Sequence, residues 1–315
     1  MGGLGMNVLV TGATGIVGSW LVQALVERGR RVVCLVRDEV PDSNFHLLGL
    51  ERKTVTVRGA LESAEDVLRA FNEYEIEVCY HLGAQAIVAV GNRHPVSTFE
   101  ANIRGSWNVL EAARQHKPLR RLVFASSDKA YGDLETLPYT EEMPLRGRHP
   151  YDASKSCADL LAQCYLATYG LPIAIVRCGN IYGGGDRNYN RIVPGTIRSV
   201  LEGRRPVIRS DGTPLRDYLY VQDAVSAYLA LGESDEVGAF NFGTETPTSV
   251  LDVVRRILRL MNSSLEPEIR NDAAHEIARQ WLSCRKARER LGWTPRYDLE
   301  RGLTETIAWY RRHLP

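Results

Sequence analysis

Residues 7–18 read NVLVTGATGIVG, and this stretch decides the fold. Its first part, Asn7–Thr11, predicts a buried strand, and the periodic apolar run Val17–Arg28 predicts a helix. Glycines between them permit a tight turn, close approach to a pyrophosphate and close packing of helix on strand. The helix start also directs backbone N–H groups toward an anion. We therefore expect a dinucleotide-binding loop built from Gly12, Thr14, Gly15, Ile16, Val17 and Gly18.

The same alternation continues outward from this loop. Further strands are predicted at Arg31–Val36, Thr54–Val57, Val78–His81, Arg121–Ala125 and Ile173–Arg177. Helices are predicted between them at Ala64–Tyr74, Pro95–His116 and Tyr151–Tyr169. Continuously apolar strands separated by helices indicate a parallel sheet covered on both faces. The predicted fold class is α/β, with a Rossmann-type doubly wound parallel sheet.

After about Cys178 the pattern loosens, and Gly, Pro and Arg become denser. Helices are still predicted near Pro194–Glu202, Val221–Leu231 and Ser249–Met261. We expect a dinucleotide-binding domain over residues 1–178, to which segments of about 215–245 return, and a smaller mixed substrate-binding lobe over 179–315. Doubly wound folds bind ligands at the carboxyl ends of their strands, so we expect the site between these two parts.

The composition of the chain limits the classes of partner that we expect. The 315 residues are 44% hydrophobic and 24% charged, with a net charge of +1. This is ordinary globular composition, and it favours neither nucleic acid nor a membrane. The opening residues 1–6 are too short and uncharged for a signal peptide, so we expect a cytoplasmic protein. The six cysteines form no C-x-x-C pair and no His cluster has zinc spacing, so we expect no metal.

Two polar clusters are predicted at the carboxyl edge of the sheet. Tyr151 and Lys155 of YDASK are four residues apart and share one helix face. A nearby ammonium favours the phenolate and lowers the Tyr pKa, so Tyr151 is a candidate general base. Ser127, Asp128 and Lys129 follow a predicted strand within ASSDKAYG at 125–132. A hydroxyl there can orient a substrate hydroxyl, and the neighbouring side chains can supply an acid and a base.

The residues at the end of the second predicted strand bear on the choice between NAD and NADP. An acid there suits the ribose of NAD, whereas an Arg accommodates the 2′-phosphate of NADP. This chain has Arg37 followed by Asp38. We expect NAD, and NADP stays open.

These motifs together resemble the extended short-chain dehydrogenases/reductases, in the sugar-nucleotide epimerase/dehydratase group. The further matching pieces are HLGAQ at 81–85, RCGNIYGGGD at 177–186, RDYLYVQD at 216–223, FNFG at 240–243 and LGWTPR at 291–296. The match spans nearly the whole chain. It implies an enzyme that binds a nicotinamide dinucleotide and a nucleotide sugar and transfers hydride at sugar C4.

Within this group Asp128-Lys129 is the informative pair. Epimerases usually carry small residues there, whereas CDP-glucose 4,6-dehydratases carry Asp-Lys, and the pair at 275–276 (HE) is similar to that subgroup too. The resemblance implies a 4,6-dehydratase acting on a CDP-glucose-like NDP-hexose to give a 4-keto-6-deoxy sugar. A UDP-hexose 4-epimerase is the alternative, followed by a non-catalytic dinucleotide-binding sensor.

The resemblance also implies the roles of individual residues. The catalytic set is Ser127, Asp128, Lys129, Tyr151 and Lys155, in which Lys129 acts either as a base or as a stabilising cation. The cofactor set adds Arg37, Asp38, Leu61, Leu82, Gly83, Ala84, Gln85, Asn102, Tyr151, Lys155 and Cys178 to the glycine loop. The substrate set is Gln85, Ser127, Asn180, Arg191, Val207, Arg209 and Arg216. Related enzymes pair helices like 95–116 and 151–169 in a four-helix bundle, which implies a homodimer.

Overall fold

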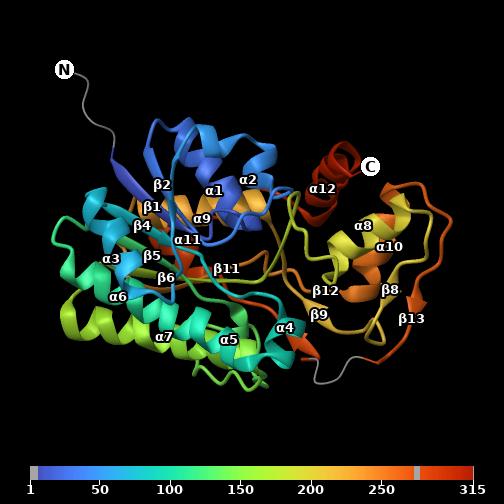
Figure 1. Cartoon of the computed structure of the whole chain (residues 1–315). Helices are drawn as coiled ribbons and strands as arrows, with labels where there is room; N and C mark the ends of the chain where they lie inside the picture. Colours follow the sequence, from blue (N-terminus) through green and yellow to red (C-terminus); the bar gives the residue numbers. More distant parts are fainter. Residues whose placement is uncertain (1–5, 273–276, 315) are drawn as a thin grey trace.

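The computed structural model describes residues 6–272 and 277–314, so the pair at 275–276 lies outside it. Its centre is a seven-stranded sheet (Figure 1) in the order β11-β6-β5-β4-β1-β2-β3. Every neighbouring pair is parallel. The strands are β1 (Asn7–Thr11), β2 (Arg31–Val36), β3 (Val55–Arg58), β4 (Val78–His81), β5 (Arg121–Ala125), β6 (Ile173–Cys178) and β11 (Gly238–Phe242). The predicted Rossmann-type fold is confirmed.

Helices cover both faces of this sheet (Figure 1). One face carries α1 (Ile16–Glu27), α2 (Asn44–Leu47), α9 (Val221–Gly232) and α11 (Arg285–Leu291), and the other carries α3 (Ala64–Glu73), α6 (Gly105–Gln115) and α7 (Pro150–Tyr169). Successive strand residues point to opposite cores: Val8 and Val10 pack with the first layer, and Leu9 packs with the second. Both faces are apolar because neither faces water.

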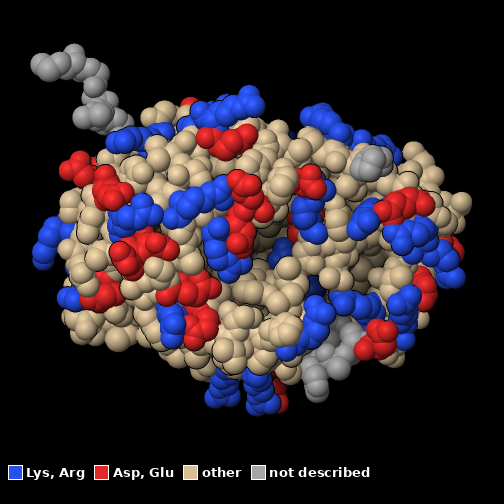
Figure 2. All heavy atoms as spheres, viewed as in Figure 1, with Lys and Arg blue, Asp and Glu red and all other residues tan. Residues whose placement is uncertain are grey.

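A smaller lobe lies beside the sheet (Figure 1). Its helices are α8 (Ile192–Leu201), α10 (Val250–Leu260) and α12 (Leu299–His313). Its short strands pair as β7 (Asn180–Tyr182) with β10 (Tyr218–Tyr220), β8 (Val207–Ile208) with β13 (Glu268–Ile269), and β9 (Leu215–Arg216) between β12 (Thr248–Ser249) and β14 (Arg279–Gln280). Figure 2 shows the surface hollowed between the lobe and the main body, with Lys and Arg side chains around the hollow.

Two buried carboxylates of RDYLYVQD tie the lobe to the sheet. Asp217 accepts hydrogen bonds of 2.7 Å from both the backbone N–H and the hydroxyl of Thr244, just after β11. Asp223 accepts from the backbone N–H groups of Arg296 and Tyr297 at 2.9 and 3.0 Å. Burial raises the pKa of both carboxyls. These acids therefore fix how the lobe is placed over the strand ends.

The predicted helix Pro95–His116 is not one regular α-helix. It consists of α5 (Pro95–Phe99), a wider π-helical turn (Glu100–Arg104) and α6. The π turn inserts an extra residue per turn, and such turns are frequent at functional sites. Here it carries the buried Asn102, whose amide holds the loop after β4. The helical prediction was right, but periodicity did not reveal the distortion. The preceding short helix α4 (Val88–Arg93) was not predicted.

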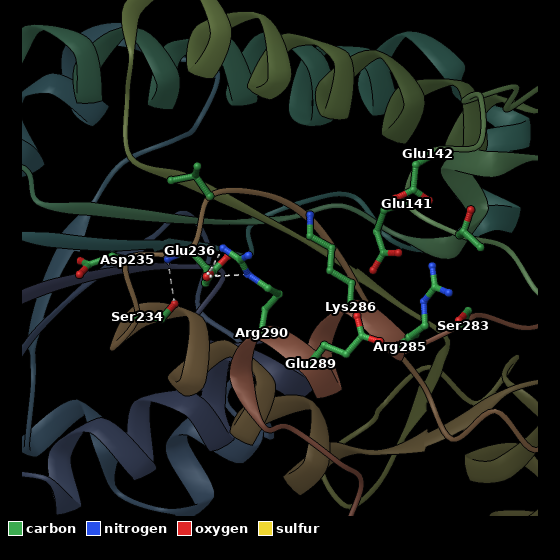
Figure 3. A pocket seen from close by; sticks show the side chains of 12 residues that line it. Glu141, Glu142, Ser234, Asp235, Glu236, Ser283, Arg285, Lys286, Glu289 and Arg290 are labelled. Atoms are coloured by element: carbon green, nitrogen blue, oxygen red, sulfur yellow. Dashed lines mark hydrogen bonds and ion pairs between the residues drawn. The ribbon is translucent and has the colours of Figure 1, made fainter.

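The outer edge of β11 is closed by side chains rather than by another strand. Lys286 Nζ donates to the Ala239 carbonyl at 2.7 Å, and Glu141 accepts from the Asn241 N–H at 2.8 Å. Both side chains line a cavity of about 660 Å³ (Figure 3), together with further carboxylates and cations. Unpaired edge groups invite association with other strands. The charges of this cavity therefore protect the edge of the sheet.

Candidate active site

The glycine loop adopts the geometry that its sequence predicts. Gly12 has φ +74°, and a Cβ there would lie 2.7 Å from the backbone nitrogen of Gly83. A Cβ on Gly18 would lie 2.0 Å from the Gly12 carbonyl oxygen. Gly15 precedes α1 as its N-cap, with no side-chain cap and no acid in the first turn. The N-terminus of α1 is therefore open to an anion, and the residues present fit a dinucleotide's pyrophosphate.

The two helix-side glycines should respond differently to substitution. Gly18→Ala is expected to destabilise the fold by about 1–3 kcal/mol, because its methyl group meets backbone. Gly15→Ala meets only the Gly12 carbonyl oxygen, at 3.3 Å, and should mainly weaken cofactor binding. Thermal unfolding and calorimetric titration with NAD separate these effects. Equal loss of stability in both variants would contradict this division.

The segment after β4 is held against the glycine loop. Gly83 N–H donates to the Thr11 hydroxyl at 3.0 Å, and Leu61 packs where a Gly83 side chain would lie. Asn102 accepts from Gln85 N–H at 2.7 Å and donates to Ser154 of α7 at 2.9 Å. These contacts bring the predicted cofactor residues Leu61, Leu82, Gly83, Ala84, Gln85 and Asn102 to the carboxyl ends of β1, β3 and β4.

Arg37 and Asp38 lie at the end of β2 and are exposed. Arg37 Nε donates to Asp38 at 2.7 Å, and its guanidinium is also 3.6 Å from a Glu62 oxygen. Two carboxylates thus lie beside Arg37, the cation that the sequence offered for a 2′-phosphate.

Ser127, Asp128 and Lys129 form a turn directly after β5. Ser127 accepts from the Lys129 backbone N–H at 3.1 Å and its hydroxyl donates to Asp128 at 3.0 Å. Tyr151 lies in the first turn of α7, which Pro150 begins at a position that favours proline. The Ser127 hydroxyl hydrogen-bonds to Tyr151, and Asp128 acts electrostatically on the phenol. The fold thus brings the two sequence clusters together.

The expected lowering of the Tyr151 pKa is wrong for this arrangement. Burial raises the pKa of Tyr151 to about 12, and the nearby cation that opposes this rise is Arg191. Lys155 donates instead to the Ala125 carbonyl at 2.8 Å. Burial lowers the pKa of Lys155 to about 8. Desolvation dominates both pKa values because both groups are enclosed.

Replacing Lys155 should stabilise the protein while removing activity. The Lys155 pKa is about 8 in the fold against an ordinary 10.5, so the buried ammonium opposes folding below pH 8. Allowing for the lost hydrogen bond, Lys155→Met should raise the free energy of unfolding by about 2 kcal/mol at pH 7. The advantage should shrink as pH rises from 8 toward 10.5, because the wild-type amine becomes neutral. Urea unfolding at pH 7 and pH 10 measures it; a variant less stable at pH 7 would contradict it.

The predicted substrate residues are more scattered. Asn180 lies on β7, and Arg191 precedes α8 with its guanidinium 3.1 Å from Asp186. Cys178, which belongs to the predicted cofactor set, ends β6, and burial raises its thiol pKa, with Asp128 adding to the rise. Arg216 is buried on β9. Val207 and Arg209 lie farther out, where Arg209 donates to the Asn190 carbonyl at 2.7 Å. Of these arginines, Arg191 acts electrostatically on Tyr151.

Sequence reasoning missed two buried residues beside this site. Gln280 donates to the Asp128 carbonyl at 2.9 Å and accepts a hydrogen bond from Lys129 Nζ. His81 shares a 2.8 Å hydrogen bond with the Thr11 hydroxyl, and burial lowers its pKa to about 3. His81 lies within the HLGAQ motif, and this motif is the signal that could have identified it. Gln280 had no local signal, because its partners are about 150 residues away in the sequence.

Comparison with known proteins identifies the family of this chain. The GDP-mannose 4,6 dehydratase family matches residues 9–306. A CDP-glucose 4,6-dehydratase of Salmonella typhimurium is 30% identical, over 98% of this chain and 91% of its own. A dTDP-glucose 4,6-dehydratase of Mycolicibacterium smegmatis is 31% identical, over 97% and 93%. A Thermotoga maritima UDP-glucose 4-epimerase structure with UDP-glucose superposes with a TM-score of 0.91 at 29% identity, covering 98% of this chain and 100% of the other.

The fold and site thus define an NAD-dependent nucleotide-sugar dehydratase/epimerase. The chain belongs to the GDP-mannose 4,6 dehydratase family, within the extended short-chain dehydrogenases/reductases. A Bacillus anthracis dTDP-glucose 4,6-dehydratase, solved in complex with NAD, has a TM-score of 0.88 at 27% identity, covering 98% and 97%. In the described part of the chain no helix could cross a membrane, and no group of His, Cys, Asp and Glu is arranged to hold a metal ion.

Proposed function

We propose that this enzyme is an NDP-hexose 4,6-dehydratase whose substrate resembles CDP-glucose. The observation that supports the proposal is the Ser127-Asp128-Lys129 turn, in which Asp128 acts electrostatically on Tyr151 and Lys129 follows Asp128 directly. Oxidation at C4 alone needs only the tyrosine, as base for the hydroxyl proton, and the cofactor, as hydride acceptor. A nearby acid and amine add what the loss of water from C5 and C6 requires.

Each side chain has a separate task in this proposal. Tyr151 takes the proton of the sugar C4 hydroxyl while Ser127 hydrogen-bonds the same oxygen. Bound NAD supplies hydride acceptance at C4 and hydride return at C6. Asp128 protonates the departing C6 hydroxyl, and Lys129 removes the C5 proton that the 4-keto group has made acidic. The net change is loss of one water, so no external oxidant or reductant is consumed.

The same proposal assigns the lobe and the cofactor. Residues 179–315 bind the sugar nucleotide, with Asn180, Arg209 and Arg216 as ligands of its diphosphate and Arg191 as a further, weaker candidate. Lys and Arg side chains around the hollow in Figure 2 support an anionic substrate. NAD is favoured over NADP because Arg37 is already paired with Asp38 and faces Glu62. A 2′-phosphate would meet these carboxylates.

A panel of substrates tests the proposal. CDP-, dTDP-, UDP- and GDP-glucose are incubated separately with the purified enzyme and NAD. Proton NMR should show a new C6 methyl signal for one of them, together with solvent deuterium at C5 when the reaction runs in D2O. Formation of the C4 epimer alone would replace the dehydratase with the 4-epimerase alternative. Cofactor binding without conversion of any nucleotide sugar would favour the sensor.

We also propose a homodimer through a four-helix bundle. α5 and α6 expose Val96, Phe99 and Trp107, and the neighbouring α7 exposes Leu160. Exposed apolar side chains on neighbouring helices support an interaction surface there. Cytoplasmic location stays a prediction, with which the six free thiols agree.

A double substitution tests the dimer. Trp107→Glu with Leu160→Glu should yield a particle of one 35.2 kDa chain, whereas the wild type should have twice that mass. Light scattering measures the mass. Leu47→Glu, an exposed leucine on α2, should leave the dimer intact. A monomeric wild type would overturn the proposal.

A further inference from the structure

Gln280 is a fully buried amide that reaches from the smaller lobe to the turn after β5. Its Nε2 donates to the Asp128 carbonyl at 2.9 Å, and its Oε1 accepts from Lys129 Nζ. A carbonyl can only accept and an ammonium can only donate, so one orientation of the amide satisfies both partners. The contact is therefore specific and not a packing accident.

The backbone of Gln280 is equally fixed. It lies on β14, where its register partner is Arg216 of β9. Arg216 is a proposed diphosphate ligand, and β14 runs parallel to its strand. The amide that holds Lys129 thus belongs to the same strand pair as a group that would bind the other end of the substrate.

The groups around Lys129 differ in which protonation state of its amine they favour. Asp128 precedes Lys129 on the same turn. Asp152 of α7 interacts with the charge of Lys129. Burial raises the Asp152 pKa, whereas Lys129 and, to a smaller extent, His149 lower this pKa. Carboxylates favour the ammonium form of a neighbouring amine. Gln280 is neutral, and both the ammonium and the amine keep an N–H that can donate to it. It fixes the position of the nitrogen with little preference for its charge.

We infer that Gln280 is a positioning residue: it holds the Lys129 nitrogen at the sugar and leaves that nitrogen able to gain and lose a proton. The inference rests on the proposed function, because the proton in question is the one on sugar C5. A glutamate at this position would keep the shape of the side chain but favour the ammonium. A leucine would remove the hydrogen bond altogether.

Gln280→Glu separates positioning from packing, because the side chain is isosteric. With the NAD-loaded enzyme, C4 oxidation is followed by cofactor absorbance and C5 proton removal by solvent deuterium in the sugar. C5 exchange should fall at least about tenfold, while C4 oxidation should stay within about twofold of wild type. Gln280→Leu should lower C5 exchange too. Gln23→Leu, at a half-buried glutamine of α1 whose amide donates to Glu27, should change neither rate.

A second measurement does not depend on turnover. Competitive acetylation of Lys129 across a pH series, read by mass spectrometry, should be about tenfold slower at pH 8 in Gln280→Glu than in wild type. Identical labelling curves and an unchanged ratio of the two rates would overturn the inference. If wild type shows no C5 exchange, the dehydratase proposal fails, and the labelling curves still decide whether Gln280 governs the proton of Lys129.

Discussion

Asp128→Asn is expected to lower formation of the 4-keto-6-deoxy product by about 10²- to 10⁴-fold, the usual contribution of a positioned acid. Asp128 is buried next to Ser127 and acts electrostatically on Tyr151. Asparagine keeps the shape and can still accept the Ser127 hydroxyl, but it has no proton to give to the departing C6 hydroxyl. The loss should therefore fall on water elimination. Oxidation at C4, followed by cofactor absorbance, should persist.

A nearby acid provides the matched control. Asp133→Asn, at an exposed position on the same loop, should leave product formation within about twofold, as for surface substitutions in general. Product is measured by the C6 methyl signal in proton NMR. Full turnover by Asp128→Asn would remove the reason for preferring a dehydratase and would support the epimerase.

Asp159→Asn is expected to lower the free energy of unfolding by about 3–5 kcal/mol, the cost of leaving a buried charge without its partner. Asp159 on α7 and Arg177 on β6 have side chains that are 0% and 2% exposed. The guanidinium makes two 2.8 Å hydrogen bonds to the carboxylate and donates a third to the Tyr131 hydroxyl. Asparagine fills the same space but leaves the guanidinium charge uncompensated.

The consequence should reach the active site. Tyr131 ends the turn that begins at Asp128, and Asp159 lies on the helix of Tyr151. Urea unfolding at neutral pH measures the loss of stability. Glu300→Gln removes an exposed partner of Arg259, 3.0 Å away, and should change stability by less than about 1 kcal/mol. Equal effects of the two substitutions would show that the Asp159–Arg177 pair contributes no more to the free energy of unfolding than an exposed ion pair does.

Much of this site could be predicted from local patterns. The conformation of the glycine loop was predicted correctly, because the positive φ of Gly12 and the contact of Gly18 with the Gly12 carbonyl are requirements of the local turn and helix. The Ser127-Asp128-Lys129 and Tyr151–Lys155 clusters follow or open elements whose ends meet at one edge of a parallel sheet. Local sequence patterns failed for properties that depend on burial. They gave the wrong direction for the Tyr151 pKa, because the spacing of Tyr and Lys says nothing of how deeply they lie.

Local sequence patterns also did not reveal the long-range contacts. The edge strand β11 is not marked by a strand–helix alternation, since α9 and the lobe's short strands precede it. Gln280 is one polar residue in an irregular segment, and only the pairing of β14 with β9 brings it to Lys129.

The sequence by itself determined that residues 7–18 form a strand, a glycine turn and the start of a helix in a parallel α/β fold, because the φ angles and helix start there depend mainly on neighbouring residues. It also determined which chemical groups are available at the strand ends. Only the tertiary structure decided which of those groups meet, which are desolvated, and that Gln280 holds Lys129. Desolvation and contacts between distant segments arise from the packing of the whole chain, and no local pattern encodes them.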